Sequence, residues 1–125
     1  MKVLLFNGSP RGEMCTYTAL SEIAGSLQSE GVETEIFWVG NKPVTGCIGC
    51  GACRNTGRCA FGDKDGVNTF IEKAKEADGF IFGAPVHYAS AGASACAFLD
   101  RCFYSASNVF AFKPGAAVVS CRGAG

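Results

Sequence analysis

The sequence predicts one α/β domain with a parallel β-sheet that helices cover on both faces. Short apolar runs, typical of strands buried on both faces, occur four times along the chain. Apolar residues at helical spacing separate these runs. The chain has 125 residues, of which 48% are hydrophobic and 18% charged, as expected of a single globular domain over residues 1–125. Strands that alternate with helices in this way are joined by right-handed crossovers and lie parallel.

The first strand is predicted at residues 3–6, an apolar run that ends in the turn residues Asn, Gly, Ser and Pro. A helix follows, and Gly31 ends it. Its apolar face is predicted to consist of Tyr17, Leu20, Ile23, Ala24 and Leu27.

The second strand is predicted at residues 34–39, which are mostly β-branched or aromatic. The segment 40–62 that follows is rich in Gly and Cys and is too long for a plain connection. Asp65 is expected to cap the next helix, and residues 79–83 read as a third buried strand. The buried face of that helix is predicted to be Val67, Phe70, Ile71 and Ala74.

The last helix and strand complete the alternation. The helix is predicted from an apolar stripe, and residues 116–119 form the fourth strand. Cys96, Cys102 and Cys121 are expected to be small core residues. The apolar stripe of the helix comprises Ala95, Phe98, Leu99, Cys102 and Phe103.

Charge and composition exclude several classes of partner. Eleven basic residues balance eleven acidic ones, so we expect no nucleic-acid or membrane partner. No run approaches the roughly 20 apolar residues of a membrane span, and the first strand begins without a signal-peptide core. These features predict a cytoplasmic protein, in which eight cysteines indicate metal or redox chemistry better than a disulfide framework.

The loop between the first strand and the first helix predicts a phosphate site. It brings backbone N–H groups and a helix dipole together with Ser9, Arg11 and Thr16. Neither a Gly-Lys-Ser/Thr ending nor a G-x-G-x-x-G pattern is present, which argues against a nucleoside triphosphate or a dinucleotide. The alternative is a simple turn followed by a helix cap.

Three motifs together resemble the flavodoxin-like NADPH-dependent FMN reductase family. They are Gly8-Ser-Pro-Arg11 after the first strand, Gly83-Ala-Pro-Val-His-Tyr88 after the third, and Phe98-Leu-Asp-Arg101 in the last helix. The resemblance implies a three-layer, doubly wound sheet of order 2-1-3-4-5, with FMN bound where strands one and three diverge.

The resemblance also implies the residues that hold the flavin. Met14 stands where the family loop often has Gly, which would strain the loop if the position required a positive φ. No residue is assigned a catalytic role, because the flavin itself accepts and donates hydride. The implied phosphate ligands are Ser9, Arg11, Cys15 and Thr16, the ring is lined by Pro85, Val86, His87 and Tyr88, and Ser120 and Arg122 approach its far edge.

Four cysteines within thirteen residues suggest a metal centre in the second loop. They are Cys47, Cys50, Cys53 and Cys59. This spacing resembles the motif of the iron-sulfur flavoproteins, a branch of the same family, and so implies a four-iron cluster near the FMN. Zinc bound by four thiolates and free or packed thiols remain alternatives.

The chain ends soon after the fourth strand, whereas the family pattern continues with a fifth strand and a closing helix. We therefore expect a chain that lacks its C-terminal strand and helix relative to the family. The fourth strand would then be an apolar edge open to pairing with another chain. Either a truncated chain or a homo-oligomer that covers this edge is predicted.

The expected function is that of an FMN-dependent oxidoreductase. NAD(P)H would reduce the flavin, which would pass electrons to a small-molecule acceptor or a redox protein. An alternative is a non-enzymatic iron-sulfur flavoprotein that carries single electrons between partner proteins. A third is a metal-stabilised structural fragment without flavin.

Overall fold

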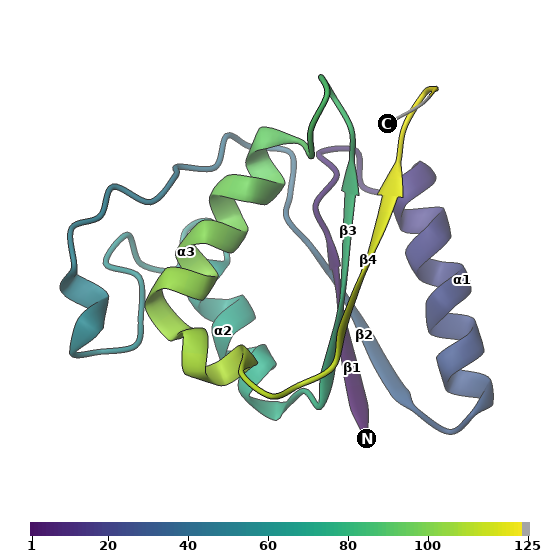
Figure 1. Cartoon of the computed structure of the whole chain (residues 1–125), viewed down its shortest axis with the longest axis horizontal. Helices are drawn as coiled ribbons and strands as arrows, with labels where there is room; N and C mark the ends of the chain where they lie inside the picture. The colour runs from purple at the N-terminus through teal and green to yellow at the C-terminus, as the bar shows by residue number, and fades with distance from the viewer. Residues whose placement is uncertain (124–125) are drawn as a thin grey trace.

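A computed structural model describes residues 1–123 and shows a four-stranded parallel sheet between two layers of helices (Figure 1). The strand order is β2-β1-β3-β4, with every neighbouring pair parallel. This confirms the α/β fold and the first four places of the expected order. The strands are β1 (Lys2–Asn7), β2 (Glu33–Trp38), β3 (Gly79–Pro85) and β4 (Gly115–Ser120).

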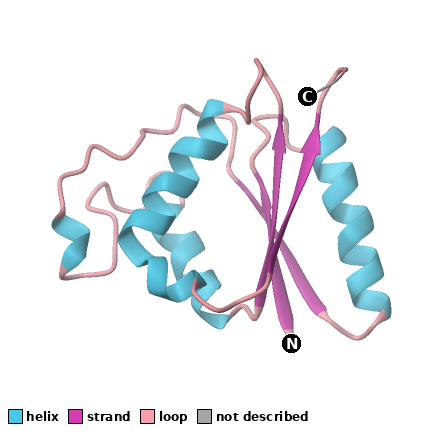
Figure 2. Ribbon diagram, in the orientation of Figure 1, coloured by secondary structure: helices cyan, strands magenta, loops and turns pink. Residues whose placement is uncertain are grey.

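The helices cover opposite faces of the sheet, as Figure 2 shows. Helix α1 (Cys15–Ser29) lies on one face, whereas α2 (Val67–Glu76) and α3 (Ala93–Phe110) lie on the other. A short 3-10 helix, η1 (Ala52–Arg54), interrupts the long loop after β2. The three layers confirm the doubly wound architecture. No helix within residues 1–123 is long and apolar enough to cross a membrane.

Two cores of different size fill the space between the layers. The larger lies under α2 and α3 and is aromatic, with Phe6, Phe70 and Phe98 fully buried at centroid separations of 5.2 to 5.7 Å. The smaller core, under α1, contains Leu5 and Leu20. Phe6 and Leu5 point to opposite faces because side chains alternate along a strand, so β1 joins the two cores.

The start of α2 differs by one residue from the prediction. Gly66, with a φ of +83°, occupies the N-cap position that Asp65 was expected to fill. Asp65 still accepts a 3.4 Å hydrogen bond from the backbone N–H of Val67, but its carboxylate also pairs with Arg101 of α3. The side chain therefore links two helices in addition to its local role.

The three isolated cysteines do not share one environment. Cys102 is fully buried in the aromatic core, and burial raises the pKa of its thiol. Cys96 and Cys121, in contrast, are exposed, so their assignment to the core was wrong. Cys96 lies on the outer surface of α3, and Cys121 lies beyond the end of β4, where no element in the described part of the chain covers it.

Candidate functional site

A cleft of about 350 Å³ opens at the carboxyl end of the sheet. The loops after β1, β3 and β4 meet there because Asn7 pairs with Gly83, and Pro85 with Ser120, in the strand register. The cleft contains every predicted flavin-site residue except Tyr88. Its lining consists of Ser9, Arg11, Met14, Cys15, Thr16, Pro85, Val86, His87, Ser120, Cys121 and Arg122.

The loop after β1 is held in shape by two side chains that sequence reasoning missed. The fully buried Asn7 accepts a 3.1 Å hydrogen bond from the Ser9 N–H and donates one of 2.9 Å to the Gly12 carbonyl. The Trp38 indole donates a 2.8 Å bond to the Ser9 carbonyl. Both residues end a strand at this edge of the sheet, which is the signal that could have identified them.

The first turn of α1 faces the cleft without a side-chain cap. The first N–H groups of any helix lack intrahelical partners and carry the positive end of the helix dipole. Because no side chain caps them here, they are free to bind a ligand. Ser9 and Thr16, residues that are only 5% and 3% exposed, add hydroxyls, and the Arg11 side chain lies at the rim. This combination suits an anion, and a phosphoryl group in particular.

The helix start is also unstrained and tied to the opposite wall. Met14 has an extended conformation with φ −116°, so the strain that its departure from Gly would have caused is absent. The Thr16 Oγ1 lies 3.1 Å from the Ser120 Oγ, a hydrogen bond that joins α1 to the end of β4. The start of α1 is therefore connected to the far edge of the cleft.

The loop after β3 supplies the apolar wall of the cleft. Pro85 and Val86 line it, and a bridge between Val86 and Ala91 folds residues 86–91 into a tight hairpin. Tyr88 sits at the tip of this hairpin with 93% of its surface exposed. The structure thus places Tyr88 outside the cleft, because the hairpin turns its side chain into solvent, and its contact with the flavin ring stays a prediction.

The four clustered cysteines line a second hollow, between the loop after β2 and the outer side of α3. Cys53 is buried and Cys59 is half-buried, whereas Cys47 and Cys50 are exposed. The backbone N–H of Gly49 donates to the Cys47 sulfur at 3.4 Å. Phe61 and Tyr104 complete the largely apolar lining.

The residue types in this hollow fit an iron-sulfur cluster. Such clusters are bound by four cysteine thiolates, and N–H groups that donate to the sulfurs adjust their reduction potential. In the positions seen here, no three Cys, His, Asp or Glu side chains of residues 1–123 are grouped so as to hold a metal ion. The cysteines therefore share one hollow without forming a closed metal site.

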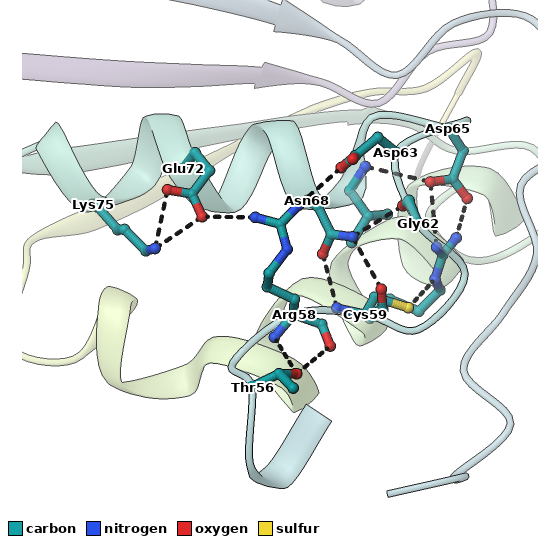
Figure 3. Close-up of polar contacts among 11 residues, drawn as sticks. Thr56, Arg58, Cys59, Gly62, Asp63, Asp65, Asn68, Glu72 and Lys75 are labelled. Carbon is teal, nitrogen blue, oxygen red and sulfur yellow. Dashed lines mark hydrogen bonds and ion pairs between the residues drawn. The ribbon is translucent and has the colours of Figure 1, made fainter. Parts of the chain in front are cut away.

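Cys59 is the most firmly placed of the four. Its backbone N–H donates a 2.8 Å bond to the Asn68 side-chain oxygen, and Asn68 donates in return to the Cys59 and Gly62 carbonyls at 3.0 Å (Figure 3). Asn68 is buried at the start of α2. Sequence patterns do not reveal this clamp, because its partners are backbone atoms, whose positions depend on how the loop before α2 folds.

Comparison with known proteins is consistent with this geometry. The profile of the NADPH-dependent FMN reductase family matches residues 1–125. An iron-sulfur flavoprotein of Methanocaldococcus jannaschii is 38% identical over 81% of this chain and 51% of its own. Another, from Methanosarcina thermophila, is 34% identical over 90% of this chain and 58% of its own. The chain thus spans about half the length of the curated relatives it matches.

Solved structures show the same fold. An apo NADH:FMN oxidoreductase (EMOB) superimposes with a TM-score of 0.54 at 20% identity, covering 79% of this chain and 48% of that chain. RosB, solved with bound 8-demethyl-8-formylriboflavin-5'-phosphate, gives a TM-score of 0.61 at 16% identity over 100% of this chain and 67% of that chain. From its sequence profile and its fold, the chain belongs to the NADPH-dependent FMN reductase family, on the branch of the iron-sulfur flavoproteins.

Proposed function

We propose that this chain binds FMN in the cleft at the carboxyl end of the sheet and acts as a flavin-dependent oxidoreductase. The observation that carries the proposal is the convergence of the uncapped start of α1, the hydroxyls of two buried residues and Arg11 at one end of a cleft whose wall includes the apolar Pro85 and Val86. That arrangement matches a ligand with a phosphoryl tail and a flat ring.

Different residues would bind different parts of FMN. Ser9, Thr16 and the first N–H groups of α1 would hold the phosphoryl group, with Arg11 adding charge at the rim. Pro85 and Val86 would pack against the ring and exclude water from it. FMN, when bound, would supply the chemistry, accepting a hydride and releasing electrons one or two at a time.

The electron donor and acceptor belong to this proposal as well. NAD(P)H is the proposed donor, and a small molecule or a redox protein the proposed acceptor. Family membership and the name of the NADH:FMN oxidoreductase neighbour support a nicotinamide donor.

A second candidate is a single-electron carrier without an enzymatic acceptor. The shared hollow of the four cysteines and the names of the curated relatives favour it. Cys47, Cys50, Cys53 and Cys59 would then hold a four-iron cluster that exchanges electrons with the flavin.

FMN binding is tested by titrating FMN fluorescence against the purified protein. Arg11→Gln should weaken affinity about tenfold, since a hydrogen bond to a charged group contributes about 1.5 kcal/mol or more. Arg54→Gln, an exposed arginine outside the cleft, is the matched control and should leave affinity unchanged. Folded protein that does not alter FMN fluorescence would refute the proposal and favour a structural fragment without flavin.

Steady-state kinetics separate the enzyme from the carrier. The FMN-loaded protein should oxidise NADH or NADPH in the presence of a quinone acceptor. Loaded protein that does not react with either nucleotide, but exchanges single electrons with a reduced ferredoxin-type donor, would establish the carrier instead.

A further inference from the structure

Arg101 of α3 is the most deeply buried charged side chain in the described part of the chain, with 1% of its surface exposed. Its Nη atoms pair with both carboxylate oxygens of Asp65, and Nη1 also donates to the Thr45 carbonyl at 3.1 Å. Its Nε donates to the Cys59 sulfur at 3.2 Å. The guanidinium carbon lies 5.0 Å from the centre of the Phe61 ring.

These contacts bind the cysteine loop at both of its ends. Thr45 precedes the first clustered cysteine, and Asp65 follows the last. Removing a guanidinium from water is costly unless its donors are bonded, and this environment bonds four of the five N–H groups of Arg101. Burial lowers the pKa of Arg101, but the hydrogen bonds to Asp65 and Cys59 outweigh that effect and raise it overall.

The bond from Nε to sulfur is not needed to anchor the loop. Asp65 and Thr45 already attach α3 to the two ends, whereas Nε is directed at a half-buried thiol in the wall of the cysteine hollow. Hydrogen bonds to the sulfurs and local charge are two of the factors that set the potential of a thiolate-bound cluster.

We propose that Arg101 is a positioning residue for Cys59, holding its sulfur in the ligand set and compensating the negative charge of the iron-bound thiolate. The inference rests on the cluster named under the proposed function. It assigns the Arg101–Asp65 pair an electrostatic role: the guanidinium favours addition of an electron to the cluster, and the carboxylate opposes it.

The two charges predict opposite shifts in the reduction potential of the cluster. Arg101→Gln removes a positive charge beside Cys59 and should lower the potential. Asp65→Asn removes a negative charge and should raise it. Each shift should change the ratio of reduced to oxidised cluster at a fixed potential at least tenfold, about 59 mV for one electron. A loss of packing alone would not give shifts of opposite sign.

The measurement is an anaerobic redox titration of the reconstituted protein, followed by absorption, with iron and sulfide quantified on the same samples. Arg58→Gln is the matched control. Arg58 lies in the same loop, but its guanidinium pairs with the carboxylates of Asp63 and Glu72 instead of with a sulfur (Figure 3). Its variant should keep the wild-type potential.

A second measurement on metal-free protein tests the positioning role without the cluster. Alkylation of Cys59 by iodoacetamide at a pH that fully ionises its thiol, followed by mass spectrometry, should be several-fold faster in Arg101→Gln than in the wild type, with Arg58→Gln unchanged. Arg101→Lys keeps the positive charge but not the forked geometry of the guanidinium, so its alkylation rate should lie between those of Arg101→Gln and the wild type.

The outcomes are distinct. A wild type that assembles no cluster would refute the proposed cluster and with it the electrostatic role, while alkylation would still decide the positioning role. A wild type with a cluster whose potential shifts in neither variant, or shifts in the same direction in both, would overturn the inference and leave the proposed function intact.

Discussion

The buried polar side chains in the described part of the chain lie at the two sites. Five polar or charged residues are almost wholly removed from solvent: Asn7, Ser9, Thr16, Asn68 and Arg101. Three shape the cleft at the carboxyl end of the sheet, and two hold the cysteine loop. A buried polar group destabilises the fold unless it is hydrogen-bonded. The positions of these five residues therefore mark where hydrogen bonds fix the local geometry in place of apolar packing.

At the residue scale, Trp38→Phe tests how the phosphate loop is held. The substitution removes the indole bond to the Ser9 carbonyl but keeps an aromatic ring. We expect FMN affinity to fall about fivefold, since a net hydrogen bond contributes about 1 kcal/mol. Fluorescence titration measures it. Tyr104→Phe on the outer side of α3 is the control, and equal affinities for all three proteins would show that the indole does not support the loop.

At the element scale, Gly8 permits the close approach of β1, β3 and α3. A Cβ at this position would lie 2.6 Å from the Ala95 Cβ and 2.9 Å from the Gly83 carbonyl oxygen. Gly8→Ala should therefore destabilise the fold by about 1 to 3 kcal/mol, measured by urea unfolding.

The matched control for that substitution is Gly25→Ala in the interior of α1. A Cβ at Gly25 would meet nothing within 4 Å, and alanine is the better helix former. This variant should gain about 0.5 to 1 kcal/mol. Equal stability of both variants would contradict the crowding at Gly8.

A charge cluster between β1, β2 and α2 predicts a pH dependence of stability. The hydrogen bond from Lys73, together with Lys2 at 3.1 Å, lowers the pKa of Glu35. The unfolded chain therefore binds this proton more readily, and the stability that Glu35 contributes is present above its ordinary pKa of 4.5 and lost as the pH falls below it.

Glu35→Gln removes the titrating group from that cluster. Between about pH 6 and about pH 3 the unfolding free energy of the variant should fall less than that of the wild type. Glu22→Gln, at an exposed position on α1, should follow the wild type. Parallel pH profiles for all three proteins would show that the cluster does not contribute to acid sensitivity.

At the scale of the whole molecule, β4 has an open edge and an uncovered face. Among the described residues it pairs with β3 alone, and Val119 is 59% exposed. Such a strand favours pairing with another chain, so we propose that copies of this chain associate through β4.

Val119→Lys should weaken that association, because a charge on an edge strand opposes burial against a partner. Size-exclusion chromatography with light scattering should give a multiple of the chain mass for the wild type and one chain for the variant. Thr69→Lys, exposed on α2, is the control. A wild type that runs as one chain at all concentrations would contradict the proposal.

The sequence by itself determined the fold class and most of the residues that meet in the cleft at the carboxyl end of the sheet. The apolar run of β1 and the helical face of Leu20 and Ala24 are local patterns, and so is the turn that joins them. Parallel strands bring their carboxyl ends to one edge, and this rule placed residues 9–16, 85–87 and 120–122 together without knowledge of their distances.

Only the tertiary structure decided what holds those residues in place. The bond from Trp38 to Ser9 and the burial of Arg101 against Asp65 join segments that are distant in sequence, and Asn68 binds the backbone of the loop just before its own helix. The exposure of Tyr88 depends likewise on how one hairpin folds. A periodic pattern shows which face of an element is buried, but not which polar partner it meets, because that depends on packing between elements.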